Sequence, residues 1–297
     1  MLGTRSAEAA EAASSPYLKG FSGFMAGYVP PIAGLYTFSP LYYHLDGSVG
    51  ADVRNGRVEF GVDVNVDAGL VPVAYLTDWK LLGGSYAFGG ALGFAGADLT
   101  ASVRGPLGNT VSVNQTTGGL ADSLIEPILL SWHVGDLHMS SAFLIYAPTG
   151  DYDVNNNLSV GKNYWAFMPQ FALTWFDPAS GWDLSGVMTF VFPTENNATQ
   201  YQTGNIFHFD WAIGKHFGEE WIFGVQGNFM QQISGDSGPG AQLGSFEISS
   251  IGIGPAVTYS TKAGKMPLIF NVKWEPDVTA TNTFKGNVIS ASLTAIL

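Results

Sequence analysis

The residue types that carry catalysis or metal binding occur at only a few places in this sequence. The string GDSGPG at residues 235–240 is similar to the nucleophile loop of serine proteases, but the pattern departs after GDSG. No histidine lies in a context that supports a triad. Gly, Asp, Ser and Pro are also the residues that form turns, and this string lies in a long polar stretch. We therefore expect a loop here, with no nucleophile at Ser237.

Two pairs of histidines are the next candidates, as metal ligands. His208 and His216 fall on one face of an extended segment, but eight residues of strand place them roughly 25 Å apart. His133 and His138 flank a short VGD turn and can approach each other, yet no third ligand is in sight. The chain also has no cysteine. The sequence predicts no metal, no cofactor and no catalytic residue.

A stripe of carboxylates lies in the stretch RVEFGVDVNVDAGL, residues 57–70. Even positions are apolar and odd positions are charged, polar or glycine, which is the pattern of a strand with two different faces. Asp63 and Asp67 on the polar face lie roughly 13 Å apart, too far for a catalytic pair. We interpret them as a charged stripe whose partners are basic side chains, with four candidates: Arg57, Arg104, Lys215 and Lys273.

The composition is unusual for a soluble protein. Of 297 residues only 12% are charged, with 12 Lys and Arg against 24 Asp and Glu, and the net charge of -12 argues against nucleic acid as a partner. No run reaches the 18 or more apolar residues of a membrane-spanning helix. The first residues, MLGTRSAEAAEAASS, lack the apolar core of an intact signal peptide.

From about residue 35 to the last residue, about twelve segments alternate apolar and polar side chains. In residues 206–217 and 221–233, aromatic side chains fill one face, and amide, carboxylate or imidazole groups fill the other. Short connectors such as VGD and GEE alternate with long polar ones such as PTENNATQYQTGN. Short turns at one end and long loops at the other are typical of an outer-membrane barrel.

Three features favour a barrel whose apolar faces point outward to lipid. The polar faces hold few lysines, unlike the outer face of a soluble sheet. The apolar faces end in aromatic residues, as at the two interfaces of a membrane. A barrel of about twelve strands is also too wide to pack a dry core, since about eight strands already leave room only for side chains. A soluble pair of β-sandwiches is the alternative.

Several connecting segments resemble one family of proteins. The strings GYVPPIAGLY, YAPTGDYD, LSVGKNYWAFMPQ, NATQYQTGNIFHFD and QQISGDSGPGAQLG occur in an order and spacing similar to the meta-pathway phenol-degradation family of outer-membrane channels. The resemblance runs from about Gly27 to the C-terminus. It implies a single-chain barrel in the outer membrane of Gram-negative bacteria, and uptake of hydrophobic, often aromatic, compounds. The final Leu297 departs from the aromatic residue that often ends such barrels.

The chain is therefore divided into an N-terminal segment, residues 1–33, and an all-β transmembrane antiparallel barrel, residues 34–297. Residues 17–31 are too apolar for a free tail and too irregular for a strand, so we expect them to fold into the lumen as a plug. The plug residues are Phe21, Phe24, Met25, Tyr28, Pro30 and Pro31. The expected lumen-lining residues are Arg57, Glu59, Asp63, Asn65, Asp67, His208, Asp210, Gln226, Asn228 and Gln232. Val58 to Leu70 are expected to turn their apolar side chains to lipid.

The expected function is passive uptake of small hydrophobic, aromatic molecules through an outer-membrane channel. The expected partners are outer-membrane lipid and these molecules, with no nucleic acid, and the barrel is expected to be monomeric. A general diffusion porin for small hydrophilic solutes is the main alternative, in which the acidic stripe gives a cation preference. An outer-membrane barrel enzyme such as a lipase is a remote one.

Overall fold

A computed structural model describes residues 14–53, 58–105, 109–156, 158–242, 245 and 247–296. Within these ranges the chain forms thirteen β-strands. None of the described residues forms a helix with the length and hydropathy that crossing a membrane would require. The strands are β1 (Gly34–Val53), β2 (Val58–Leu81), β3 (Gly84–Arg104), β4 (Thr110–Leu120), β5 (Ser123–Val134), β6 (Leu137–Ala147), β7 (Ala166–Asp177), β8 (Trp182–Pro193), β9 (Ile206–Phe217), β10 (Trp221–Gln232), β11 (Ser249–Ala263), β12 (Met266–Thr281) and β13 (Lys285–Ile296).

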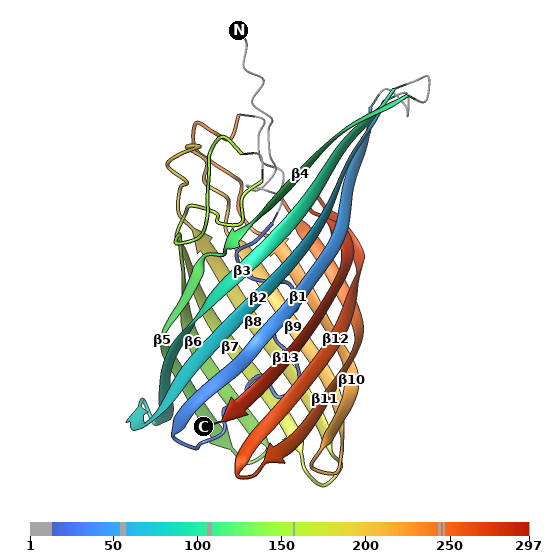
Figure 1. Cartoon of the computed structure of the whole chain (residues 1–297). Coiled ribbons are helices and arrows are strands. Elements are labelled where there is room, and N and C mark those ends of the chain that lie inside the picture. Colours follow the sequence, from blue (N-terminus) through green and yellow to red (C-terminus); the bar gives the residue numbers. More distant parts are fainter. Residues whose placement is uncertain are drawn as a thin grey trace.

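Twelve of these strands close into an antiparallel barrel (Figure 1). Each pairs with its neighbours, and β1 closes the ring by pairing with β13. The exception is β3, which changes its partner along its length. Residues 85–91 pair with β5, and residues 94–104 pair with β4. The short strand β4 is an addition to the ring, and among the pairings described it is hydrogen-bonded to β3 alone. The predicted fold class, an all-β antiparallel barrel of about twelve strands, is confirmed.

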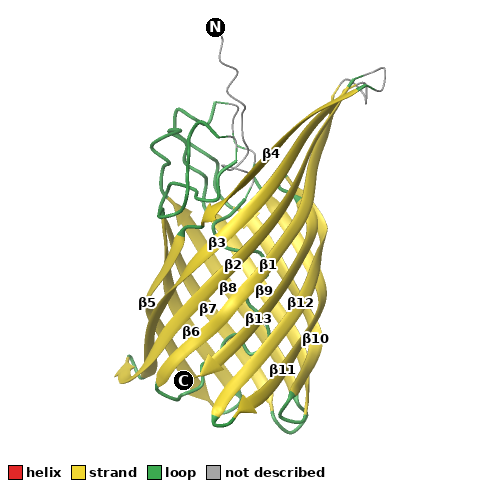
Figure 2. Cartoon of the chain, viewed as in Figure 1, coloured by secondary structure: helices red, strands yellow, loops and turns green. Residues whose placement is uncertain are grey.

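The two ends of the barrel differ (Figure 2). At one end, which also holds the last described residues, tight turns join the strands, and Gly135, Gly218 and Gly264 adopt positive φ there. At the other end the connections after β6, β8 and β10 are longer. We call these the turn end and the loop end.

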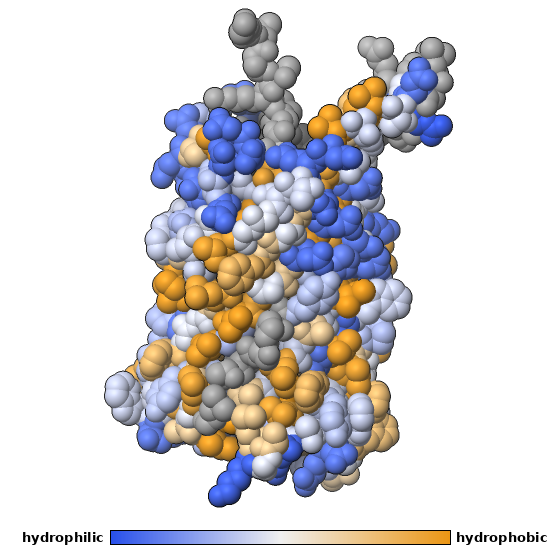
Figure 3. Space-filling model, in the orientation of Figure 1, coloured by the Kyte–Doolittle hydropathy of each residue, from blue (hydrophilic) through white to orange (hydrophobic). Residues whose placement is uncertain are grey.

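On the face seen in Figure 3, apolar side chains form a band between the two ends of the barrel. On β7 to β10 the exposed side chains are aromatic or aliphatic and alternate with buried ones along each strand. A surface this apolar is what lipid, not water, requires. The prediction that the apolar faces turn outward is confirmed for these strands. The exposed aromatic residues include Trp165, Trp175, Trp182, Trp221 and Trp274.

Four strands extend past the rest of the barrel at the loop end (Figure 1). We call this extension the tongue and define it as residues 47–53, 58–64, 99–104 and 110–115. Its base follows the register Gly47–Val64–Leu99 across β1, β2 and β3.

The predicted orientation is wrong for residues 60–70, the part of this stretch whose side chains the structure describes. Val64 is buried, whereas Asp63, Asn65 and Asp67 are exposed on the outer face. The register of β2 with β3 is continuous from Glu59 to Leu76, so the whole stretch keeps one alternation.

The reason lies further along β2. Val71, Val73 and Tyr75 are exposed to the lipid side, so the odd positions of this strand from residue 61 to residue 75 face outward. The carboxylates lie nearer the loop end of β2 than these apolar residues and are exposed on the outer face, so they need no lumen to stay solvated. Asp67 is held there by the Tyr42 hydroxyl at 2.6 Å and by His44 Nδ1 at 2.8 Å, both on the outer face of β1.

Candidate functional site: the lumen and its N-terminal strap

Residues 14–33 run through the lumen from the loop end to the turn end, and we call them the strap (Figure 1). At the loop end, Lys162 Nζ donates to Ser14 Oγ at 2.7 Å. At the turn end, the Tyr28 ring lies 5.1 Å from that of His133 and 4.9 Å from that of His138. The strap therefore reaches both mouths of the barrel.

Charged side chains from the wall hold the upper half of the strap. The Tyr17 hydroxyl donates to Asp210 Oδ2 at 2.8 Å, and the backbone N–H of Ser22 donates to the same oxygen at 3.1 Å. Lys19 forms a buried ion pair with Asp277 at 2.7 Å. Lys273 donates to the backbone carbonyls of Gly20 and Ser22. Breaking a buried ion pair by removing one partner costs about 3–5 kcal/mol, so this half is firmly anchored.

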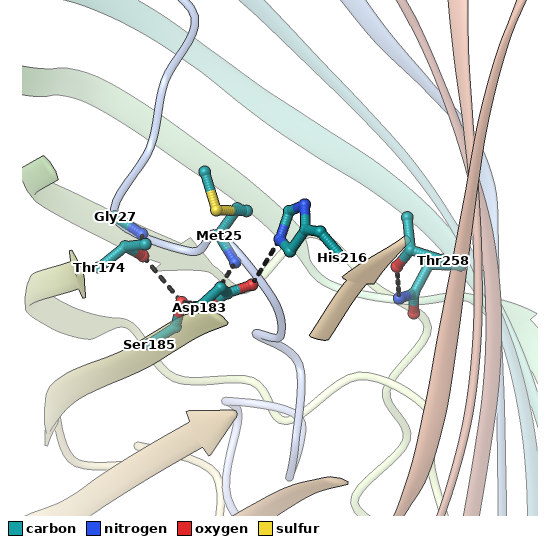
Figure 4. A network of polar contacts seen from close by, with 8 residues as sticks. Met25, Gly27, Thr174, Asp183, Ser185, His216 and Thr258 are labelled. Atoms are coloured by element: carbon teal, nitrogen blue, oxygen red, sulfur yellow. Dashed lines mark hydrogen bonds and ion pairs between the residues drawn. The ribbon is translucent and has the colours of Figure 1, made fainter. Parts of the chain in front are cut away.

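A hydrogen-bonded network on β7, β8 and β9 holds the lower half (Figure 4). The N–H of Gly27 donates to Thr174 Oγ1 at 2.9 Å, and Thr174 Oγ1 lies 2.8 Å from Ser185 Oγ. Ser185 in turn donates to Asp183 Oδ1 at 2.7 Å, and the N–H of Met25 reaches the same oxygen at 3.5 Å. The strap thus satisfies polar groups on the wall that would otherwise need water.

Glycines let the strap lie directly against the wall. Gly20 adopts φ +62°, and a Cβ there would collide with the Glu275 carboxylate. A Cβ on Gly27 would lie 2.7 Å from the backbone N of Thr174 and from the carbonyl O of His138. The neighbours of Gly27 are backbone atoms that cannot give way, so a side chain there would push the strap away, whereas at Gly20 the end of the flexible Glu275 side chain would move first.

Gly27→Ala is therefore expected to weaken the docked strap and to raise the frequency of large openings in single-channel recordings. Gly69→Ala is the matched control. Neither glycine has a positive φ, and nothing lies within 4 Å of a Cβ built on Gly69. Equal gating by the two variants would show that contact with the wall does not explain the effect.

The predicted plug residues lie as follows. The Phe24 ring packs on the inner wall, where Gly214 and Gly224 leave room for it. Pro30 accepts a hydrogen bond from the Tyr36 hydroxyl through its carbonyl, and Pro31 is exposed. Phe21 is 39% exposed although it lies inside the barrel.

The inner wall has two unlike halves. From β7 to β12 it carries the charged and polar groups that bind the strap, including the predicted residues His208, Asp210, Gln226, Asn228 and Gln232, all of which face inward and are buried. From β1 to β3 most inward positions are apolar, with the buried Ser85 as an exception near the turn end. The apolar positions include Leu45, Val64, Val66, Ala68, Leu70, Ala95 and Ala97. Val66, Ala68, Leu70 and Ala95 are only partly buried, so they border the space beside the strap.

The remaining predicted lining residues do not belong to this wall. Asp63, Asn65 and Asp67 face outward. Arg57 lies outside the described residues, and so does the side chain of Glu59.

Sequence reasoning missed several residues that bind the strap. They are Thr174, Asp183, Lys273, Glu275 and Asp277, all buried. The signal was present in NVKWEPD, residues 271–277, where apolar Val272 and Trp274 alternate with charged side chains. Among the proposed basic partners whose contacts the structure describes, Lys273 alone reaches the interior. Lys215 donates to the Ser180 carbonyl on the outer side.

The remaining candidate metal-binding and catalytic residues make structural contacts. His133 Nδ1 lies 3.0 Å from His138 Nδ1, and within the described residues no group of three metal-ligating side chains converges. In the GDSGPG loop, the backbone of Ser237 pairs with Gln202, and Asp236 Oδ1 accepts from Gln232 Nε2 at 2.7 Å. These contacts brace the loop.

Comparisons with known proteins agree with this architecture. The crystal structure of the COG4313 outer membrane channel from Pseudomonas putida F1 is similar over 91% of this chain and 97% of that chain, with 14% identity and a TM-score of 0.66. The crystal structure of a Pseudomonas aeruginosa FadL homologue is similar over 98% of this chain and 97% of that chain, with 8% identity and a TM-score of only 0.37. No curated protein sequence matches the chain.

A family model, described as "Putative MetA-pathway of phenol degradation", matches residues 47–293. This range covers most of the chain and confirms the resemblance drawn from the connecting segments. The chain belongs to this family, and it is an outer-membrane β-barrel of the Gram-negative type.

Proposed function

We propose that the protein is a passive channel through which small, uncharged, hydrophobic molecules, aromatic ones above all, cross the outer membrane. The observation that carries the proposal is the division of the lumen. The strap lies against the polar half and hydrogen-bonds to several of its groups, and the apolar half from β1 to β3 is left to border the remaining space. The family's description, phenol degradation, names a pathway for aromatic compounds and supports the same substrate class.

The physical basis is partition of the cargo between water and the wall. An aromatic ring the size of a phenylalanine side chain gains about 1.5–3 kcal/mol when it leaves water for an apolar surface. Phe21 on the strap is 39% exposed inside the barrel and adds aromatic contact surface. A sugar or an ion gains nothing there and loses its hydration. A single chain in outer-membrane lipid suffices for this mechanism.

The test is uptake of labelled toluene at low concentration by intact cells. Their lipopolysaccharide leaflet is the barrier that such a channel would bypass. A deletion strain is expected to take up toluene several-fold more slowly than the complemented strain and to lose growth on an aromatic carbon source. Equal uptake and equal growth by the two strains would overturn the proposal.

The porin alternative is judged by a different observation. In liposomes, the full-length protein is expected to give slow swelling in arabinose and in glycine, because the strap spans the lumen. Fast swelling in both solutes would favour a general diffusion porin instead.

A further inference from the structure

The tongue has two faces of opposite character. Its outer face carries Asp63 and Arg104 and, just below the tongue, Asp98, which accepts a hydrogen bond from Thr116 at 2.6 Å. On its inner face the exposed side chains are apolar: Phe60, Val103, Val111 and Val113 are 46%, 40%, 71% and 66% exposed. The wet, charged outer face shows that this extension stands in water, so lipid does not account for the apolar inner face.

The register places these four side chains together. Phe60 pairs with Val103, and Val103 pairs with Val111 on the next strand. Val113 lies opposite Ala101, which in turn lies opposite Val62. Directly opposed residues on neighbouring antiparallel strands share a face, so the group forms one apolar surface.

This surface continues without a break into the lumen. Below it, three pairs on β2 and β3 follow at every second position: Val64 with Leu99, Val66 with Ala97, and Ala68 with Ala95. The run ends at Leu70, which lies opposite Gly93. The inward positions of β2 and β3 from Phe60 to Leu70 carry no ionisable side chain.

An aromatic residue lies where the tongue meets the barrel. Gly47 is an inward position of β1, and a Cβ built on it would lie 2.9 Å from the Cβ of Phe284. Phe284 therefore sits on the inner side of the tongue's base, beside the pair of Gly47 with Val64. The apolar track has an aromatic contact at its entry into the lumen.

We propose that the inner face of the tongue is a capture site for small, uncharged, apolar molecules, which it delivers along this track to the lumen. The inference rests on the proposed function for its transport step, but binding to the tongue is a separate property. Continuity with the apolar half of the lumen, together with the lack of charge along the track, sets the chemistry of the occupant.

The binding test uses the absence of cysteine from the chain. Val113→Cys on the inner face and Asn114→Cys on the outer face are each labelled with bimane in the full-length protein in nanodiscs. Nitrobenzene, a small uncharged aromatic quencher, is then titrated in. Quenching is expected to be several-fold more efficient at position 113 than at position 114, and to fall when unlabelled toluene competes.

Equal quenching at the two positions would overturn the proposal. A second copy of the chain seated on the tongue would also overturn it, and would shift the bimane emission at position 113 with the number of copies per nanodisc, without competition by toluene. The Val111→Asn/Val113→Asn variant supplies a transport readout. It is expected to slow toluene uptake several-fold at low concentration and to match wild type at high concentration.

The outcomes separate the two proposals. Efficient, competable quenching at position 113 in a protein that does not accelerate toluene uptake would reject the proposed function and leave the capture site standing. Normal uptake by the wild type with equal quenching at the two positions, and no effect of the double variant, would reject the capture site alone.

Discussion

Deletion of residues 1–30 is expected to raise the single-channel conductance several-fold. The strap runs the whole length of the lumen and lies against the wall through Gly20 and Gly27, so its removal leaves a wide, polar and wet pore along β7 to β12. Small ions would then pass where strap backbone now lies. Planar-bilayer recordings of the purified barrel measure this directly.

Two controls accompany the deletion. Removal of residues 1–13 alone keeps every strap contact described above and is expected to leave the conductance low. A full-length Lys19→Cys/Asp277→Cys variant joined by a short bis-maleimide linker replaces the buried ion pair with a covalent bridge and is expected to suppress openings. Unchanged conductance after deletion of residues 1–30 would contradict a strap that narrows the pore.

Val225→Arg is expected to destabilise the barrel by about 2–4 kcal/mol. Val225 points outward near the middle of β10, between Phe223 and Phe229, and pairs with Ile213 on β9. A guanidinium at this depth of the membrane has no water to solvate it. Equilibrium unfolding in lipid vesicles measures the loss.

Asn65→Arg is the matched control for this second prediction. Asn65 also points outward, but it lies nearer the loop end of β2 than the lipid-facing Val71, between Asp63 and Asp67. The new guanidinium would remain in water next to carboxylates, so a change below about 1 kcal/mol is expected. Equal destabilisation by the two arginines would contradict the assignment of the lipid-facing band.

The phase of a strand could be predicted from the sequence where its two faces differ at membrane depth. On β9, Phe207, Phe209 and Trp211 can face only lipid, and His208 and Asp210 can face only the interior, so their orientation followed directly. Because side chains alternate with a period of two and lipid accepts only the apolar face, a single orientation of the strand is possible.

The same reasoning gave the wrong face for residues 60–70 because strand depth was unknown. The lower part of β2, residues 70–76, is apolar at almost every position and does not reveal its phase. Its upper part alternates cleanly but stands above the lipid, where carboxylates face outward. Alternation alone does not tell a wet lumen from a wet outer surface.

Two other features were not accessible from local patterns. Strand β4, Thr110–Leu120, is not among the segments expected from alternation, because uncharged polar residues and glycines fill most of it. The path of the strap depends on contacts such as Tyr17 with Asp210, which are 193 residues apart in the chain. The composition of residues 17–31 predicted that they are shielded from water, but only the closed barrel determines which wall residues contact them.

The account rests on the apolar inner wall as the path of the cargo, and two neighbouring substitutions test it most directly. Val66→Asp and Asn65→Asp each add one carboxylate, one residue apart, the first toward the lumen and the second toward the outer water. Both variants are checked for normal abundance and for barrel folding by heat-dependent gel mobility. Uptake of labelled toluene at low concentration is then measured in the deletion strain carrying each variant. The account predicts that Val66→Asp slows uptake several-fold while Asn65→Asp leaves it at the wild-type rate; equal uptake by the two variants would contradict it.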